Sequence, residues 1–447
     1  MMTLRTALVA AAVAVVTATN NGFPNALGRT PLRGVRTWNS VRTDINASFV
    51  ASQVDGLLAP IDGLGTTLWA AGYADVGIDD AWEACGLGVN GSYHDAAGRP
   101  IVNTTRFPDM RALTAYARTR NVSMSWYGNC CGCAAGEHAL SEPHYAQDAQ
   151  ATVDLGFRGL KVDGCGNEPN MTAWASALNA TGVPILLENC NDGDPFRPTR
   201  RPDGSVDCPY NLFRTSIDGA PDWRSTMWNV FETLPQLDVS SPGCFAYADM
   251  LTIGSPAPDA HLEAPSFVAN CGGQRLTAAQ ARAQFAAFAL LSSPLVLGFD
   301  VANASERALW GPIVTHAPLL AANAAWDGEA GRLVARSAAE DAVPVAVGGV
   351  CELVQNNTLP RWMVVGKRLA STAAGATAEF AATVLVGDWA GAVDVSAELT
   401  AMGFAAGATV NTVDGWTGAD TGPVSGAWAA AGVTSPGGLY RIFTLAA

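Results

Sequence analysis

The chain has 447 residues, of which 49% are hydrophobic and 15% charged, a composition typical of a folded protein with a large core. At this length a large domain with a smaller companion is expected. Its 40 acidic residues outnumber the 26 basic ones, and the formal net charge of -14 repels phosphate backbones and anionic membrane surfaces. Composition therefore argues against nucleic-acid and membrane partners.

The N-terminus resembles a secretory signal peptide over residues 1–18. Arg5 precedes an apolar run, residues 7–16, that is too short to span a bilayer and is followed by small residues. The ten cysteines suit an oxidising compartment, and the chain carries several N-x-S/T sequons. These begin at Asn46, Asn90, Asn103, Asn121, Asn170, Asn179, Asn303 and Asn356. We therefore expect a glycoprotein that is secreted, or lysosomal or vacuolar, and reaches its compartment through the secretory pathway.

Short apolar segments alternate with amphipathic ones over residues 24–322. The expected strands are residues 34–38, 73–78, 122–127, 159–162, 185–188, 212–215, 245–251 and 295–299. The expected helices are residues 110–120, 144–155, 171–180, 223–234 and 278–291. Strands that alternate with helices indicate an α/β fold with a parallel sheet, and eight repeats favour a (β/α)8 TIM barrel over an open doubly wound sheet.

The sequence changes character near residue 325. Strand-like segments lie at residues 343–347, 361–366, 381–386, 393–395 and 439–445, with Gly, Ala and Thr between them. This pattern predicts a C-terminal antiparallel β-sandwich over residues 325–447.

Acidic residues recur where the expected barrel strands end. Asp79 and Asp80, Asp163, Asp218 and Asp249 all fall at such positions. Catalytic groups of a barrel lie at the C-terminal ends of its strands, although any single Asp there could instead cap a helix. Lys161 shares a strand face with Asp163, where its charge would keep that carboxyl ionised. With the aromatic residues Trp38, Tyr127 and Trp223, the set suggests a sugar-binding site.

The chain resembles glycoside hydrolase family 27, the melibiases or α-galactosidases, over nearly its full length. The matching stretches are residues 27–31 (LGRTP), Gly34, Trp38-Asn39, 73–82 (YADVGIDDAW), 106–110 (RFPDM), 159–165 (GLKVDGC), 213–218 (FRTSID), 248–251 (ADML) and 293–295 (SPL). The Lys-x-Asp-x-Cys and Arg-x-x-x-Asp elements are specific in combination and in this order.

The resemblance implies a retaining glycosidase that removes terminal α-D-galactosyl residues, with Asp163 as nucleophile and Asp218 as general acid/base. It implies that no metal or cofactor takes part, and that the pKa of Asp218 is raised by its surroundings. The implied substrate-binding residues are Trp38, Asp79, Asp80, Tyr127, Lys161, Cys165, Asn191, Arg214 and Asp249.

The sequence does not determine which terminal sugar is removed, because the chain departs from the family pattern near the sugar 2-position. The segment Cys190-Asn191-Asp192-Gly193 lacks the Trp that the family carries beside the sugar 2-position, and it looks like a branch that includes β-L-arabinopyranosidases. An α-N-acetylgalactosaminidase and a catalytically inactive carbohydrate-binding barrel are also compatible with the sequence. A GxGxxG match beginning at Gly86 and a Cys-rich stretch near His138 lack the context of dinucleotide and zinc sites. The sequence does not indicate the oligomeric state.

The cysteines also depart from the family pattern, since Ala81 replaces a family Cys and Cys85 stands a turn later. The resemblance implies a disulfide between Cys190 and Cys208, and another between Cys165 and one of Cys130, Cys131 and Cys133. A third, between Cys244 and Cys271, is expected without support from the family pattern.

Overall fold

The computed structural model describes residues 25–130, 144–166, 170–190, 197–255, 275–347, 352–369 and 378–445. The expected signal peptide, Asn191, Cys131 and Cys271 lie outside these residues.

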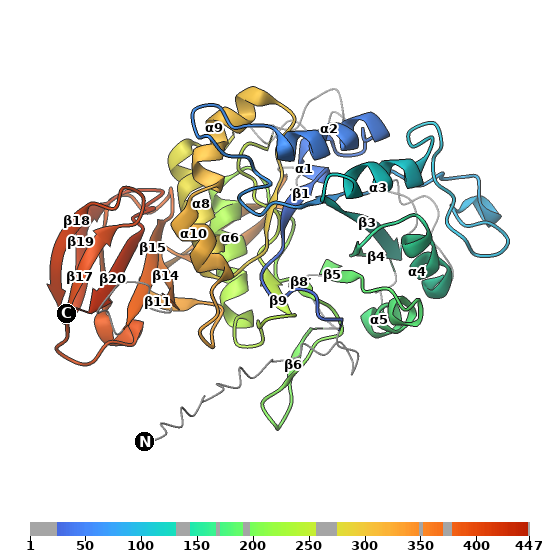
Figure 1. The fold of residues 1–447 in the computed structure, drawn as a ribbon. Helices are drawn as coiled ribbons and strands as arrows, with labels where there is room; N and C mark the ends of the chain where they lie inside the picture. Colours follow the sequence, from blue (N-terminus) through green and yellow to red (C-terminus); the bar gives the residue numbers. More distant parts are fainter. Residues whose placement is uncertain are drawn as a thin grey trace, which may run out of the picture.

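The N-terminal part of the chain forms a closed parallel barrel (Figure 1). Its strands are β1 (Arg33–Arg36), β2 (Asp75–Gly77), β3 (Ser123–Cys130), β4 (Gly159–Gly166), β5 (Leu186–Cys190), β8 (Leu212–Arg214), β9 (Phe245–Tyr247) and β10 (Leu295–Leu297). They lie in the order β10-β1-β2-β3-β4-β5-β8-β9, and every neighbouring pair is parallel. Leu251, just beyond β9, pairs in parallel with Leu297 and closes the ring. The predicted TIM barrel is confirmed, with all eight strands at the expected places.

Helices surround the barrel. They are α1 (Trp38–Val41), α2 (Ala47–Leu58), α3 (Met110–Arg118), α4 (Tyr145–Asp154), α5 (Met171–Ala180), α6 (Trp223–Thr233), α8 (Ala278–Leu290), α9 (Ala304–Val314) and α10 (Ala317–Ala324). Several begin where an Asn, Asp or Thr side chain accepts a hydrogen bond from a first-turn amide, as Asn46 does for α2 and Asp222 for α6. The five helices predicted from the sequence are confirmed.

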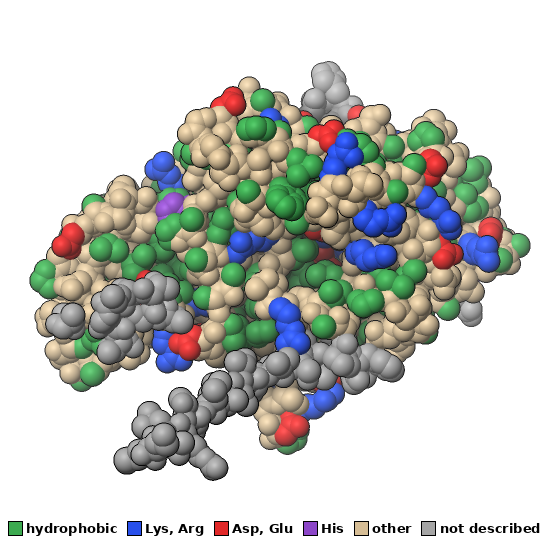
Figure 2. Space-filling view, in the orientation of Figure 1, with side chains coloured by type: hydrophobic (Ala, Val, Ile, Leu, Met, Phe, Trp, Pro, Cys, Tyr) green, Lys and Arg blue, Asp and Glu red, His purple; other side chains and the backbone are tan. Residues whose placement is uncertain are grey.

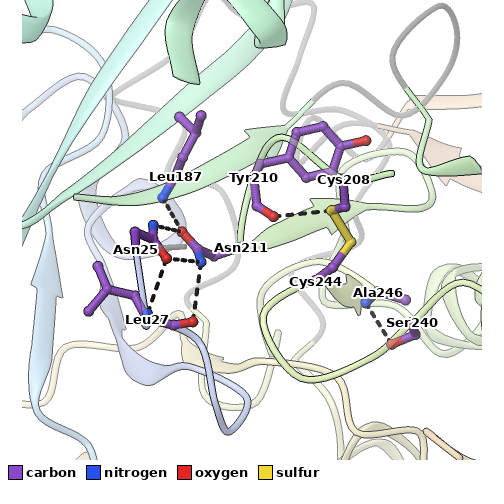
Figure 3. The surroundings of a disulfide bond; sticks show 9 residues. All are labelled: Asn25, Leu27, Leu187, Cys208, Tyr210, Asn211, Ser240, Cys244 and Ala246. Carbon is purple, nitrogen blue, oxygen red and sulfur yellow. Dashed lines mark hydrogen bonds between the residues drawn. A yellow bond between two sulfur atoms is a disulfide. The ribbon is translucent and has the colours of Figure 1, made fainter. Parts of the chain in front are cut away.

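The segment between β5 and β8 breaks the β/α alternation. Its described residues form a short hairpin of β6 (Thr199–Arg200) and β7 (Val206–Asp207), followed by Cys208. A disulfide joins Cys208 to Cys244, across the residues that lead into β8 and β9 (Figure 3). Asn211 is fixed close by, since its side chain bonds Asn25, the amide of Leu187 and the carbonyl of Leu27.

This disulfide shows that two cysteine predictions were wrong. Cys190 is a buried free thiol, and Cys244 is not bonded to Cys271. Cys190 ends β5 and so lies at the C-terminal end of the barrel strands, whereas Cys208 and Cys244 both precede strands, so they meet at the opposite end. Cys85 is also disulfide-bonded. The expected partners of Cys165 lie among residues whose side chains are not described.

The C-terminal part is a β-sandwich, as predicted. Its strands are β11 (Arg332–Arg336), β12 (Glu340–Val347), β13 (Glu352–Pro360), β14 (Trp362–Leu369), β15 (Glu379–Val386), β16 (Val393–Glu398), β17 (Thr409–Asp414), β18 (Asp420–Ser425), β19 (Ala427–Val433) and β20 (Arg441–Leu445). Six form one sheet in the order β11-β14-β15-β20-β17-β18, with further pairs β12-β13 and β16-β19, and all of these pairings are antiparallel. Phe380, Trp428 and Phe443 lie in its own core.

The sandwich packs against helices α6 and α8 of the barrel (Figure 1). Helix α8 is buried around most of its circumference because it lies between the barrel and strands β14 and β15. On the face shown in Figure 2, acidic, basic and hydrophobic side chains are interspersed. Within the described residues, none of the helices has the length and apolar character needed to cross a membrane.

Candidate active site

The nucleophile predicted from the sequence, Asp163, lies on β4 and is held by donors. Tyr127 on β3 donates its hydroxyl hydrogen to Asp163 Oδ2 at 2.9 Å, and the Gly164 amide donates to Oδ1 at 3.0 Å. Asn129 in turn donates to the Tyr127 oxygen at 3.2 Å. Burial, followed by the charge of Asp163, raises the pKa of Tyr127, so its hydroxyl stays protonated and donates. Asp163 is half-buried and can therefore be reached by a ligand.

Lys161 is bound to Asp79 rather than to Asp163. Its Nζ donates to Asp79 Oδ2 at 2.8 Å, and both side chains are almost fully buried. Asp79 follows β2, and its amide donates to Thr37 Oγ1 at 3.0 Å. Lys161 therefore makes its direct ion pair with Asp79, and Asp163 adds a weaker attraction at longer range.

Asp80 adjoins this pair and has a buried carboxyl neighbour, Glu83, that the sequence did not single out. Burial raises the pKa of Asp80 to about 6. Glu83 is only 3% exposed, and burial followed by the Asp80 charge raises its pKa well above the usual range. Burial and mutual repulsion therefore favour the protonated form of both carboxyls relative to free ones. A buried Glu three residues after two strand-end aspartates is the signal that would have found it.

Arg214, at the end of β8, forms an ion pair with Asp218. Burial acts to raise the pKa of Asp218, but the charges of Arg214 and then Lys161 outweigh burial and hold it below its usual range. This differs from the expectation of a raised pKa, because the Arg214 guanidinium touches the carboxylate directly. The Asp218 side chain is 37% exposed and is accessible to a ligand.

Asp249 supports the loop that carries Asp218. It follows β9 with a positive φ of 85°, and its Oδ2 accepts a 2.6 Å hydrogen bond from the Gly219 amide. Asn229 on α6 joins the same two segments, donating to the carbonyls of Ile217 and Ala248. Burial raises the pKa of Asp249 to about 6, although Arg214 opposes the shift.

Of the remaining predicted residues, only Trp38 and Trp223 have side chains that the structure describes. Trp38 begins α1, is half-buried, and lies 5.4 Å from the Arg42 guanidinium. Cys165 lies in β4, but its side chain, like all of Asn191, falls outside what the structure describes. Trp223, expected among the site's aromatic residues, instead donates its indole N–H to the Val386 carbonyl of the sandwich.

A buried ion pair crosses the barrel interior. Arg36 on β1 and Glu188 on β5 meet at 2.5 Å, and their side chains are 2% and 3% exposed. Gly77 leaves room for Arg36, since a Cβ there would lie 2.7 Å from Arg36 Nε. Cys190, two residues beyond Glu188, faces the same interior; burial raises the pKa of its thiol although Arg214 and Lys161 oppose this. The sequence predictions missed this pair because nothing local links residues 36 and 188.

The structure thus brings together side chains from the ends of five strands, β2, β3, β4, β8 and β9. They pair as Asp79 with Lys161, Tyr127 with Asp163, Arg214 with Asp218, and Asp249 with the backbone beside Asp218. In the described part of the chain, no group of three His, Cys, Asp or Glu residues is arranged to hold a metal ion.

Comparison with known proteins identifies the family. A melibiase family model, described as alpha galactosidase A, matches residues 45–313. This chain belongs to the melibiase family.

Among curated melibiase relatives, an α-galactosidase of Cyamopsis tetragonoloba is 25% identical over 67% of this chain. An α-N-acetylgalactosaminidase of Gallus gallus is 28% identical over 64% of this chain and 68% of its own length. The chain spans 65% of the length of the Cyamopsis relative, and 63% of that of a rice α-galactosidase.

Solved melibiase structures share the whole fold. α-Galactosidase I of Mortierella vinacea has a TM-score of 0.69 at 18% identity, covering 94% of this chain and 98% of that one. A β-L-arabinopyranosidase of Geobacillus stearothermophilus in complex with arabinose also has a TM-score of 0.69, at 15% identity, covering 95% of this chain and 99% of that one. These similarities establish the barrel with its sandwich.

Proposed function

We propose that this melibiase is a retaining glycoside hydrolase that removes terminal α-D-galactosyl residues from oligosaccharides, glycoconjugates or polysaccharides. The observation that carries the proposal is the pair of accessible carboxyls in unlike surroundings. Asp163 is fixed by Tyr127 and a backbone amide, and Asp218 lies beside Arg214 on a separate loop. A retaining mechanism requires two carboxyls with different roles.

In the proposed mechanism, Asp163 attacks the anomeric carbon while Asp218 donates a proton to the departing oxygen. Asp218 then removes a proton from water, which hydrolyses the covalent glycosyl-enzyme. Asp79, Asp80, Lys161, Arg214 and Asp249 bind sugar hydroxyls, and Trp38 covers an apolar face of the ring. These contacts place the anomeric carbon beside Asp163.

The ion pair with Arg214 keeps Asp218 deprotonated in the structure, whereas a general acid must carry a proton. We infer that Arg214 turns its donors to a sugar hydroxyl when substrate binds, which weakens its hold on Asp218. Because the pKa of Asp218 is low at the outset, activity should be highest at acidic pH and fall as pH rises.

The glycone is the part of the proposal that a direct assay must test. The Gallus relative is named an α-N-acetylgalactosaminidase, and the Geobacillus structure is of a β-L-arabinopyranosidase. The decisive assay offers the p-nitrophenyl glycosides of α-D-galactopyranose, β-L-arabinopyranose and α-N-acetylgalactosamine at about pH 4 to 6. Fastest release from the galactoside supports the proposal. Faster release from another glycoside reassigns the glycone, and binding without turnover of any would indicate an inactive carbohydrate-binding barrel.

We further propose that the protein matures in the secretory pathway and is glycosylated. The N-terminal apolar run, the sequons and the Cys208–Cys244 disulfide support this. N-terminal sequencing of the mature protein should begin soon after residue 18, and glycosidase treatment should lower its apparent mass.

A further inference from the structure

The loop that carries Asp218 is short and reaches the β-sandwich. It leads from Asp218 to Asp222, which caps helix α6 by accepting hydrogen bonds from the amides of Arg224 and Ser225. Within the loop, Ala220 is fully buried, and its amide donates to Ser225 Oγ at 2.9 Å. The loop and the first turn of α6 therefore form one tightly bonded unit.

This unit is fixed to the sandwich at three points. Ala220 packs against Ala346 of β12 in a small cluster of their own. The Trp223 indole, 2% exposed, donates to the Val386 carbonyl at the end of β15 with a 2.8 Å bond. Arg224 binds Asp388 through Nε, at 2.9 and 3.2 Å from the two carboxylate oxygens.

On the barrel side, the loop is held by the Gly219 amide on Asp249, by Asn229 and by the Arg214–Asp218 ion pair. Asp218 itself is more exposed than the sugar-site carboxyls Asp79 and Asp249. Because Asp218 lies five residues from Trp223, a shift of the first turn of α6 must move the acid. Proton donation requires hydrogen-bond geometry and is sensitive to displacements of about 1 Å.

We propose that the β-sandwich is a positioning device for the general acid: Val386 and Asp388 hold Trp223 and Arg224, and thereby set the position of Asp218. The inference rests on the proposed retaining mechanism. It gives the second domain a role in catalysis although none of its described residues lies among the site residues. Trp223 and Arg224 are positioning residues, since they act through the loop.

The test compares two substrates with one glycone. p-Nitrophenyl α-D-galactopyranoside has a leaving group that departs without a proton, whereas methyl α-D-galactopyranoside needs general acid catalysis. Trp223→Phe keeps an aromatic side chain and removes the indole N–H, and Asp388→Ala removes the carboxylate that holds Arg224. Each should lower kcat for the methyl glycoside by about tenfold and for the p-nitrophenyl glycoside by less than about twofold. Asp218→Ala sets the upper limit of this difference.

Two matched controls separate positioning from general destabilisation. Arg361→Ala breaks an Arg Nε–Asp341 pair of 3.0 Å inside the sandwich, and Trp310→Phe removes an indole bond to Glu306 on α9. Both should lower kcat for the two substrates equally or leave it unchanged. Melting temperatures of all variants are measured alongside.

The outcomes separate the two claims. Equal loss on both substrates, or no loss, in Trp223→Phe and Asp388→Ala overturns the positioning role while the proposed function stands. If the wild type hydrolyses the p-nitrophenyl glycoside but Asp218→Ala shows no leaving-group dependence, the assignment of the acid is wrong and the positioning role fails with it. If another glycone is preferred, the same pair of leaving groups is used on that glycone.

Discussion

The carboxyls of the site differ in solvent exposure, and the difference matches the proposed division between sugar binding and catalysis. Asp79, Asp80 and Asp249 are buried and bonded to neighbouring groups, whereas Asp163 is half-buried with a phenol and an amide on its oxygens. A nucleophile must reach the substrate, and Asp163 meets this condition because its hydrogen-bond donors hold the carboxylate in place without covering it.

Asp163→Gly should lower kcat by about a thousandfold or more, because it removes the proposed nucleophile and leaves Asp218, the other accessible carboxyl of the proposed pair, in the role of acid/base. Azide should then restore turnover of p-nitrophenyl α-D-galactopyranoside and yield β-galactosyl azide, since the anion occupies the vacated space. The product is identified by NMR. Undiminished activity of this variant would show that another residue is the nucleophile.

Asp218→Ala should affect substrates according to their leaving group. Loss of the acid should cost about 10²- to 10⁴-fold in kcat on the methyl glycoside and far less on the p-nitrophenyl glycoside. The alkaline limb of the pH–rate profile should also disappear, because no acid remains to be deprotonated. An equal loss on both substrates would contradict the assignment.

The Arg36–Glu188 pair makes a prediction about stability. Arg36→Met leaves a buried carboxylate without its partner and should lower the free energy of unfolding by about 3 to 5 kcal/mol. The double variant Arg36→Met/Glu188→Met removes both charges and should recover most of this loss. Urea unfolding of both single variants and the double variant measures the coupling. Additive losses would show that the two side chains act independently.

At the scale of elements, the end of the barrel at which a cysteine lies determines which other cysteines it can bond. Glu188 and Cys190 lie on β5 and face the interior beneath the site, so Cys190 is far from residues that lead into strands at the other end. Cys208 and Cys244 lead into the neighbouring strands β8 and β9 and bond there. The disulfide thereby ties the β6–β7 hairpin segment to the barrel.

Cys208→Ser should destabilise the protein by about 4 kcal/mol, from the chain entropy restored to a loop whose ends are 36 residues apart. Activity at low temperature should be kept, because the disulfide lies away from the catalytic strand ends. Thermal unfolding and p-nitrophenyl galactosidase assays measure the two effects. Non-reducing peptide mapping should recover a Cys208–Cys244 peptide and a free Cys190; a Cys190–Cys208 peptide would contradict this structure.

At the scale of the whole molecule, buried carboxyls with raised pKa values make the folded protein more stable at acidic pH than at neutral pH. Burial is the main cause that raises the pKa of Asp75, Asp80 and Asp249, each to about 6. A carboxyl whose folded pKa exceeds its unfolded value of about 3.9 binds its proton more tightly in the native state. Its contribution to stability is complete below about pH 4 and is lost as pH rises through about 6.

Asp75→Asn tests this relation away from the active site. Asp75 lies on β2, is 6% exposed, and accepts bonds from Ser125 Oγ at 2.9 Å. Between about pH 4 and 7, this carboxyl should lower the wild-type free energy of unfolding by about 3 kcal/mol. The variant should lack that part of the slope. Identical pH dependence of wild type and variant in urea unfolding would refute it.

Residue order alone determined the architecture and the strand ends at which the candidate site residues lie. Apolar runs alternating with amphipathic helices placed the eight strands, and parallel strands bring their C-terminal ends to one edge of the barrel. That rule gathers Asp79, Asp163, Asp218 and Asp249 without any knowledge of their contacts. Strands β17 and β18 were missed because β17 has only two apolar residues among polar ones, and β18 contains Gly and Pro, which are rare in strands.

Only the tertiary structure decided which side chains meet. It paired Lys161 with Asp79, joined Arg36 to Glu188 across 152 residues, bonded Cys208 to Cys244, and turned Trp223 from the sugar site to the sandwich. Local patterns report which face of an element is buried, because burial follows the period of the helix or strand. Local patterns do not show which residues from distant parts of the chain pack against that buried face. Those contacts depend on how the barrel closes and how the second domain packs against it.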